Sequence, residues 1–257
     1  ISTRPDYIDA DRIKLLKQYS VTTVEIGAQS MVNEVLNLSG RGHTSNDVKN
    51  AVNILQNNGF ETGIHLMVGL PGDTEDRFRY TIEKVIHINP DMIRIHPTIV
   101  FRNTALAEMY MEGHYEPLTM ADAVRLCKYA LRKFETAHIP VIRLGLQTTS
   151  EMETTGSIVT GPYHPAFRSL VEGSIFLDMA SCLLEQAQQR NEEVVFRVNP
   201  KDVSNFRGLR NGNIRTLKED FSVGDFQVKT DPSQQRGHLC MTAGGIKYTI
   251  NKMMNVI

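Results

Sequence analysis

Short apolar segments rich in β-branched residues recur along the first part of the chain, and they constrain the fold more than any other feature. They lie at 21–26, 62–70, 92–95 and 141–146. Near-continuous apolar runs of this length are typical of strands buried on both faces of a parallel sheet. Intervals of about 30 to 50 residues leave room for a helix between successive strands, as in repeated βα units. Right-handed crossovers then place consecutive strands side by side in a barrel or an open sheet.

Helical patterns occupy the intervals between these segments. We expect helices over 9–19, 44–57, 73–87, 105–111 and 119–137. Asp9 can cap the first helix, and Thr44 or Ser45 can cap the second. Asp73 and Asp76 place negative charge at the start of the third, where the helix dipole favours it. The alternation of strands and helices predicts the α/β class.

The texture of the sequence changes after residue 150. Residues 151–165 are rich in Thr, Gly and Pro and predict a long loop. Beyond it we expect helices at 167–189 and 213–221 and strands at 193–198, 226–229 and 238–242. The sequence therefore predicts two domains, a βα-repeat domain over 1–149 and a small α/β unit over 150–257.

The charge balance excludes one class of partner. The chain has 28 Lys and Arg against 29 Asp and Glu, so it is not a polycation that binds nucleic acid by bulk charge. Cations between Arg207 and Lys218 surround Phe206. This segment either binds RNA through phosphates and stacking or forms a solvated helix face. No apolar run reaches the roughly 18 residues of a membrane helix.

The cysteines exclude a metal knuckle built from this chain alone. Cys127, Cys182 and Cys240 are widely separated, and no CxxC motif is present. Zinc knuckles and iron–sulfur loops need closely spaced cysteines. The odd, scattered set is typical of a reducing compartment, and we expect a cytoplasmic protein.

Polar and glycine-rich residues follow each of the predicted strands. They are Thr3 to Pro5, Gly27 to Ser30, Gly69 to Gly72, His96 to Thr98, and Gln147 with Thr148. The carboxyl ends of parallel strands meet at one edge of the sheet, so we expect a ligand site there. The sequence GLPGDT at 69–74 is either a turn that lets a ligand approach the backbone or a tight turn that leads into a helix. It matches neither the P-loop nor the GxGxxG pattern.

Single residues near these ends carry alternative interpretations. Gln29 can hydrogen-bond a hydroxyl or an amide, or it is a solvated loop residue. Arg41 can clamp a carboxylate, or it is a surface arginine. Glu25 lies in an apolar strand, so its carboxylate needs a partner and favours a barrel-lining position. We expect His43 to be a turn or cap residue and His65 to be a core histidine with its hydrogen bonds satisfied.

Five ordered motifs resemble one enzyme superfamily. They are VEIGAQSMVNEVLNLSGRGHT at 24–44, HLMVGLPGDT at 65–74, IRIHPTIVFRNTALAEMY at 93–110, VIRLGLQTT at 141–149 and GPYHPAFRSL at 161–170. Together they resemble radical S-adenosylmethionine (SAM) enzymes, nearest to the Elongator catalytic subunit and its shorter bacterial relatives. The resemblance implies a partial (β/α)6 barrel with a C-terminal extension. It also implies a [4Fe–4S] cluster that cleaves SAM to a 5′-deoxyadenosyl radical.

The resemblance also implies site residues. The positions matching family contacts to SAM are Gln29, Ser30, Arg41, Met67, Val68, Gly69 and Thr98. Among these, Gln29 would face the ribose, Arg41 the carboxylate and Met67 to Gly69 the adenine. The residues expected on the substrate side are Arg4, Glu25, His96 and Gln147. The substrate would be a nucleobase, a tRNA or a small metabolite.

The sequence departs from the family in one respect. The family holds its cluster with a CxxxCxxC-like loop after the first strand, and Cys127, Cys182 and Cys240 do not match it. We therefore expect this chain to resemble the C-terminal part of such an enzyme and to be inactive by itself, with the cluster bound by a segment outside it. A cluster-free barrel module that binds RNA or a metabolite is the alternative. An unpaired edge on the first strand would favour homodimerisation or rearrangement of the N-terminal residues.

Overall fold

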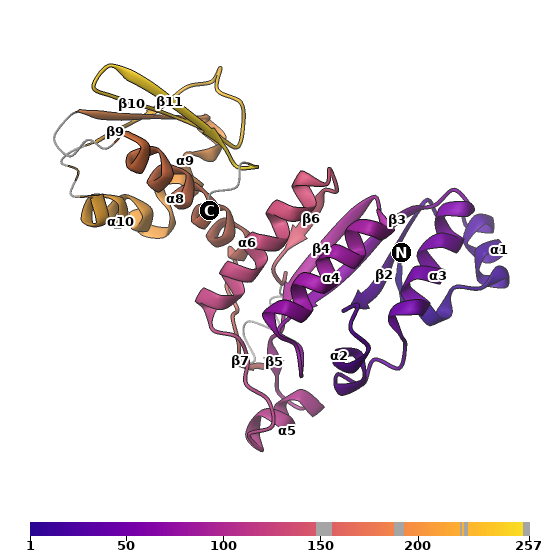
Figure 1. The fold of residues 1–257 in the computed structure, drawn as a ribbon. Coiled ribbons are helices and arrows are strands. Elements are labelled where there is room, and N and C mark those ends of the chain that lie inside the picture. Colours follow the sequence, from indigo (N-terminus) through magenta and orange to yellow (C-terminus); the bar gives the residue numbers. More distant parts are fainter. Residues whose placement is uncertain (148–155, 188–192, 222, 224–225, 254–257) are drawn as a thin grey trace. The chain divides into compact units, whose positions relative to one another are not determined.

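The computed structural model describes residues 1–147, 156–187, 193–221, 223 and 226–253. The chain divides into two compact units, Ile1–Phe167 and Arg168–Ile257. Figure 1 shows the elements of each unit. The sequence places the boundary between 149 and 150, whereas the first compact unit extends to Phe167. It does so because β7 (Ile158–Thr160) pairs antiparallel with β5 (Val100–Phe101) in the first unit.

The first unit contains a five-stranded sheet whose strands are all parallel. Its order is β1 (Ser2–Thr3), β2 (Thr23–Gln29), β3 (Glu61–Val68), β4 (Met92–Pro97) and β6 (Val141–Leu144). Neighbours in the sheet follow chain order, as in a section of a β/α barrel. This confirms the predicted α/β class and its parallel sheet.

Helices separate these strands at the predicted places, except that α2 was not expected from the sequence. They are α1 (Ala10–Gln18), α2 (Asn33–Leu38), α3 (Ser45–Asn57), α4 (Glu75–Ile88), α5 (Ala105–Met111) and α6 (Met120–Thr136). The Asp9 carboxylate caps α1, and Thr44 forms a reciprocal capping box with Asp47 in α3. Helix α4 begins later than expected, because Thr74 is its cap and Asp73 turns back toward Gly69.

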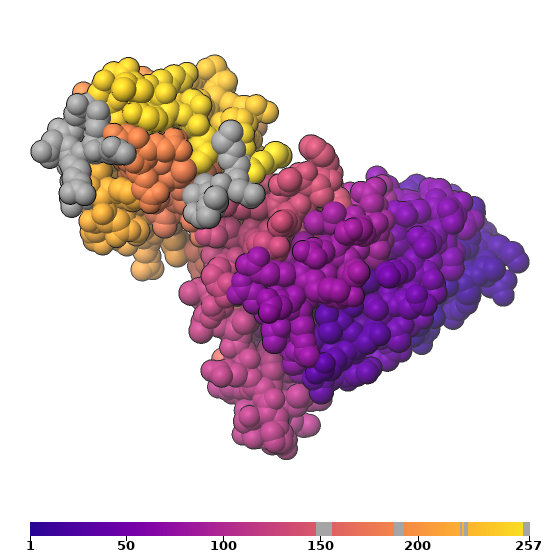
Figure 2. All heavy atoms as spheres, viewed as in Figure 1, coloured from indigo at the N-terminus to yellow at the C-terminus, as the bar shows by residue number. Residues whose placement is uncertain are grey.

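The two faces of the parallel sheet differ in character. One face packs against α3 and α6 and buries aliphatic side chains such as Ile26, Ile64 and Ile95. Figure 1 shows α3, α4 and α6 along this face, and Figure 2 shows their outer surface. Alternation along the strands places the other residues on the opposite face. This opposite face, called the polar face below, carries Glu25, Gly27, Gly63, His65, Met67, Arg94, His96 and Arg143.

The second unit is a small α/β fold. Its four-stranded sheet has the order β11 (Ile246–Asn251), β10 (His238–Ala243), β8 (Val194–Val198) and β9 (Gln227–Thr230). The helices α8 (Phe167–Ala187), α9 (Val203–Arg207) and α10 (Gly212–Phe221) lie on one side of this sheet (Figure 1). Phe206 is fully buried here, with its ring 5.1 Å from that of Phe196. Of the two alternatives for this segment, stacking of an RNA base on Phe206 is therefore excluded, since the ring belongs to the core.

Candidate cofactor site at the strand ends

The end of β2 turns the Gln29 side chain onto the polar face. Gln29 has a φ of 64°, and the pairing of β2 with β3 shifts register between Ile26 and Gln29. The side-chain amide consequently lies over Gly27, which has no side chain to occupy that space. Gln29 is only 8% exposed, and its Oε1 has no hydrogen-bond partner among the described residues. A buried amide oxygen without a donor is suited to accept a hydrogen bond from a ligand.

Arg41 is a desolvated cation beside the same strand ends. It lies in the loop between α2 and α3, and its guanidinium donates to the Met67 sulfur over 3.1 Å. The buried Nε of Arg41 has no hydrogen-bond partner in the described part of the chain. Burial, with a further contribution from Arg4, lowers the pKa of Arg41 below its ordinary value. An arginine in this state favours an incoming carboxylate.

Hydrogen bonds on both sides of Gly69 fix the turn after β3. Gly69 has a φ of 79°; its N–H donates to Asp73 Oδ2 over 3.2 Å, and its carbonyl accepts the Tyr115 hydroxyl over 2.6 Å. Burial raises the pKa of Asp73 to about 6. Thr98 holds the neighbouring strand end, since its backbone N–H and its hydroxyl both donate to the Val68 carbonyl over 2.9 Å. This turn is therefore tight, and it also shapes the edge at which a ligand would bind.

Glu25 has the partner that its position requires. Its carboxylate on β2 reaches across Gly63 of β3 and pairs with Arg94 of β4 over 2.8 Å. A Cβ on Gly63 would lie 2.8 Å from the Glu25 Cγ, so only glycine leaves room for this ion pair. Glu25 thus lines the polar face, as expected from sequence.

Two imidazoles lie on the same face of the sheet as this ion pair. The rings of His65 and His96 are 4.4 Å apart between centroids in an edge-to-face arrangement. Burial first, then nearby positive charges, lowers the pKa of His65 to about 3 and that of His96 to about 4. Both Nε2 atoms are buried without a hydrogen-bond partner among the residues described. The expectation of a satisfied core histidine at 65 is therefore wrong, because the ring faces the site with an unpaired nitrogen.

Other predicted residues lie at the rim or point elsewhere. The Ser30 hydroxyl is buried against Thr81 of α4, at 3.3 Å between oxygens. Arg4 is half-exposed, pairs with Asp6 over 2.8 Å and reaches the Gly42 carbonyl at 3.4 Å, beside Arg41. Gln147 is exposed just beyond β6.

His43 and Arg143 complete the surroundings of the site. His43 is 5% exposed and lies 3.2 Å from the Ala28 carbonyl, consistent with the expected turn role. Sequence reasoning missed Arg143 and Arg94 as site residues. The alternation of Arg94 with His96 along β4 was the available signal, because both must share one face of the strand.

The chain's cysteines do not fit an iron–sulfur cluster. They lie on α6, α8 and β10, and Cys127 and Cys240 are buried. Among the described residues, no three His, Cys, Asp or Glu side chains form a group that could hold a metal ion. The residues at the strand ends, in contrast, fit SAM, because they offer the unpaired amide oxygen of Gln29 to its hydroxyls and the unpaired Nε of Arg41 to its carboxylate.

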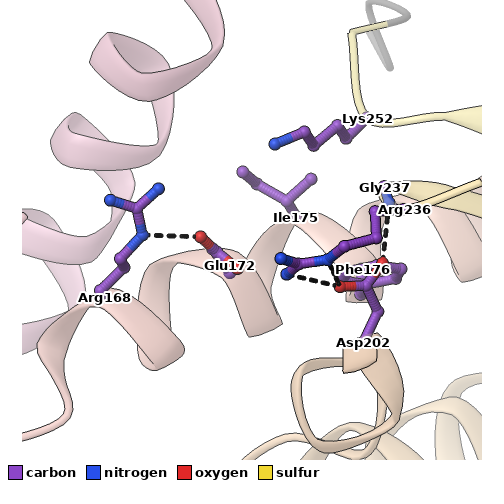
Figure 3. Close-up of a pocket in the computed structure, with 8 residues that line it drawn as sticks. All are labelled: Arg168, Glu172, Ile175, Phe176, Asp202, Arg236, Gly237 and Lys252. Atoms are coloured by element: carbon purple, nitrogen blue, oxygen red, sulfur yellow. Dashed lines mark hydrogen bonds and ion pairs between the residues drawn. The ribbon is translucent and has the colours of Figure 1, made fainter. Parts of the chain in front are cut away.

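The second unit holds a separate polar cavity of about 250 Å³ (Figure 3). Glu172 on its wall accepts from Arg168 Nε over 2.8 Å and from Asn205 Nδ2 over 2.7 Å. Asp202 accepts two bonds from Arg236 and one from the Gly237 backbone. Both carboxylates therefore have partners, and the wall is an internally satisfied network that stabilises this unit.

Two family models match successive ranges of the chain. The Radical SAM superfamily model matches residues 1–85, and the Radical SAM C-terminal domain model matches residues 90–175. In the part of the chain that the structure describes, no helix combines the length and apolar character needed to span a membrane.

Curated relatives share about a third of the matched residues. The tRNA uridine(34) acetyltransferase of Methanocaldococcus jannaschii is 34% identical over 133 residues, which are 51% of this chain and 25% of that protein. Elongator complex protein 3 of Homo sapiens is 34% identical over 131 residues, or 49% of this chain and 24% of that protein. The chain thus spans about a quarter of the length of these relatives.

A solved structure shares the fold. It is the archaeal Methanocaldococcus infernus Elp3 with an N-terminal deletion, which matches with a TM-score of 0.60 and 29% identity. The match covers 68% of this chain and 40% of that one. The agreement of both family models, the curated relatives and this structure shows that the chain belongs to the radical SAM superfamily and resembles its Elongator-like branch.

Proposed function

We propose that this chain is the SAM-binding and substrate-binding portion of a radical SAM enzyme that modifies a nucleobase of tRNA. The observation that carries the proposal is the pair of unpaired, buried polar atoms at the strand ends, Gln29 Oε1 and Arg41 Nε. With its cluster, bound SAM supplies a 5′-deoxyadenosyl radical. The relative named as a tRNA uridine(34) acetyltransferase supports tRNA as the substrate.

Each strand end has a distinct task in this proposal. Arg41 binds the carboxylate of SAM, since its guanidinium is desolvated and its Nε is unpaired. Gln29 accepts a hydrogen bond from a ribose hydroxyl. Met67 and the backbone of Gly69 and Thr98 border the adenine, which the rigid turn after β3 keeps in a fixed position. The chain thereby orients the nucleoside and shields it from water.

We further propose that the cluster ligands come from outside these 257 residues. Cys127, Cys182 and Cys240 lie on three separate elements, so they do not form a cluster loop. The chain by itself is then expected to bind SAM without cleaving it. Anaerobic iron and sulfide analysis of the purified chain tests this, and about four irons per chain would contradict it.

The separation of the three cysteines also favours a second candidate, a cluster-free cytoplasmic module that binds RNA or a metabolite. The two candidates differ in the protein that contains the chain in the cell. A native protein with a cysteine-rich cluster segment and about four irons supports the enzyme. A native protein of this length without iron supports the module. The unpaired edge of β1 keeps homodimerisation as a prediction for either candidate, and light scattering measures it.

Calorimetric titration of the 257-residue chain with SAM tests the cofactor site. We expect Gln29→Ala and Arg41→Gln each to weaken binding about tenfold, equivalent to ~1.4 kcal/mol. Arg207→Gln removes an exposed cation in the second unit and is expected to leave the affinity unchanged. Wild-type affinity in both strand-end variants would overturn the proposed site.

A further inference from the structure

The polar face carries more positive than negative charge. Arg41, Arg94 and Arg143 contribute three guanidinium groups, and Glu25 is the carboxylate that pairs with one of them, Arg94. SAM brings a sulfonium and an ammonium against one carboxylate, which Arg41 binds, so the assembled site stays positive and repels a cationic substrate. The charge balance calls for a negative group on the molecule that binds beside SAM.

Arg143 is the cation best placed to meet such a group. It pairs in register with Arg94 on the adjacent strand, so both side chains lie on the same face. No described residue forms a hydrogen bond or ion pair with its guanidinium. The strand register places His65, Arg94 and Arg143 in one row across β3, β4 and β6. The charge of Arg143 also helps to lower the pKa of both His65 and His96.

The two histidines supply uncharged partners. Their buried Nε2 atoms lack hydrogen bonds within the described ranges, and their rings stay neutral at pH 7. A neutral imidazole can donate one hydrogen bond without adding charge. A guanidinium fork matches the paired oxygens of a carboxylate or a phosphoryl group. Together these side chains present donors from β3, β4 and β6 on one face of the sheet.

We propose that the substrate carries an oxyanion, a carboxylate or a phosphoryl group, held by Arg143 together with His65 and His96. The identification of this ligand as the substrate rests on the proposed function. The affinity of the site for an oxyanion does not, because it follows from the side chains of the polar face alone.

Carbon-13 NMR of the chain labelled at histidine Cε1 tests the proposal at pH 7. The chain has eight histidines, and His65→Gln and His96→Gln assign the two resonances of interest. Separate titrations use inorganic phosphate and acetate as probes. We expect saturable shifts of both resonances with at least one probe, and the tighter probe identifies the group as phosphoryl or carboxylate.

Three variants make the test specific. Arg143→Gln is expected to weaken probe binding about tenfold. Arg143→Lys keeps the charge without the fork and is expected to retain part of the affinity. The control, Arg207→Gln, removes an exposed cation from the second unit and should bind the probe like the wild type. An unchanged His43 resonance in each variant shows that the first unit is folded.

Two results would overturn the proposal. One is the absence of saturable shifts at His65 and His96 with either probe. The other is an undiminished affinity in Arg143→Gln. Calorimetry with SAM separates this failure from that of the proposed function, since loss of SAM binding with retained probe binding refutes only the cofactor site.

Discussion

The side-chain amide of Gln29 lies over Gly27, so close that a Cβ on Gly27 would be 2.9 Å from Gln29 Nε2. The positive φ of Gln29 and the adjoining register shift produce this arrangement. The absent side chain of Gly27 therefore sets the position of the amide. A glycine in the strand interior here serves a close approach rather than a turn.

Gly27→Ala is expected to displace the Gln29 amide and to weaken SAM binding about tenfold. The fold should remain, because the clashing atom is the far end of a side chain that can move. Calorimetry measures the affinity and urea unfolding the stability. Gly212→Ala is the matched control, since its helical φ and open surroundings accept a Cβ. Full SAM affinity in Gly27→Ala would contradict the role assigned to this glycine.

Gly63→Ala is expected to separate Glu25 from Arg94. The new Cβ would lie 2.8 Å from the Glu25 Cγ and 3.1 Å from the Met92 Cγ, so two side chains must move. We expect a loss of about 1–3 kcal/mol in the free energy of unfolding, as for other overpacked sites. SAM affinity should change little, because neither Glu25 nor Arg94 is assigned a contact with SAM. If Gly63→Ala were as stable in urea as the wild type, a glycine would not be needed at this position for Glu25 to reach Arg94.

The two histidines make the stability of the first unit depend on pH. Their pKa values are about 3 and 4 in the folded chain, below the ordinary value of 6.5. Unfolding therefore takes up protons below pH 6.5. The free energy of unfolding of the first unit consequently falls as the pH drops from 6.5 toward 4 and 3. Each histidine changes the free energy of unfolding by about 1.4 kcal/mol per pH unit in this window.

Urea unfolding at several pH values between 4 and 7 measures this dependence. Asp73 acts in the opposite sense, because its pKa of about 6 is raised and its contribution is lost as pH rises through 6. His65→Gln combined with His96→Gln should reduce the acid-side slope by about two protons. The exposed control His114→Gln should not. An unaltered slope in the double variant would show that these rings are already protonated in the folded chain.

Much of the scaffold follows from sequence because its signals are local. The apolar runs of β2, β3 and β4 and the caps Asp9 and Thr44 depend on neighbouring residues alone. The hairpin of β10 and β11 was missed, although Gly244 and Gly245, both at positive φ, are a recognisable two-residue turn.

The candidate site was predictable only in part. Gln29 is found by its place at a strand end, and both Gln29 and Arg41 are found by family resemblance. The pairing of Glu25 with Arg94 depends on the strand order and on Gly63 between them, which no single segment encodes. The unpaired state of His65 likewise depends on what packs against both faces of β3. Such features arise from tertiary structure, so the sequence alone predicts a core position for a histidine in a strand.

Asp202 organises the polar cavity of the second unit, and its removal is expected to destabilise that unit. The carboxylate is 3% exposed and accepts Arg236 Nε over 3.0 Å, Arg236 NH2 over 2.9 Å and the Gly237 N–H over 2.8 Å. Asp202→Asn replaces one acceptor oxygen with a donor, which then faces another donor. We expect a loss of about 2 kcal/mol in the free energy of unfolding, the order of an unsatisfied buried group next to a charge.

Urea unfolding, monitored by proteolysis within residues 168–257, measures this loss. Asp11→Asn, with a 92% exposed side chain, is the control. If Asp202→Asn unfolds at the wild-type urea concentration, the network is peripheral to the stability of the unit, and the cavity of Figure 3 must be reconsidered as a ligand site.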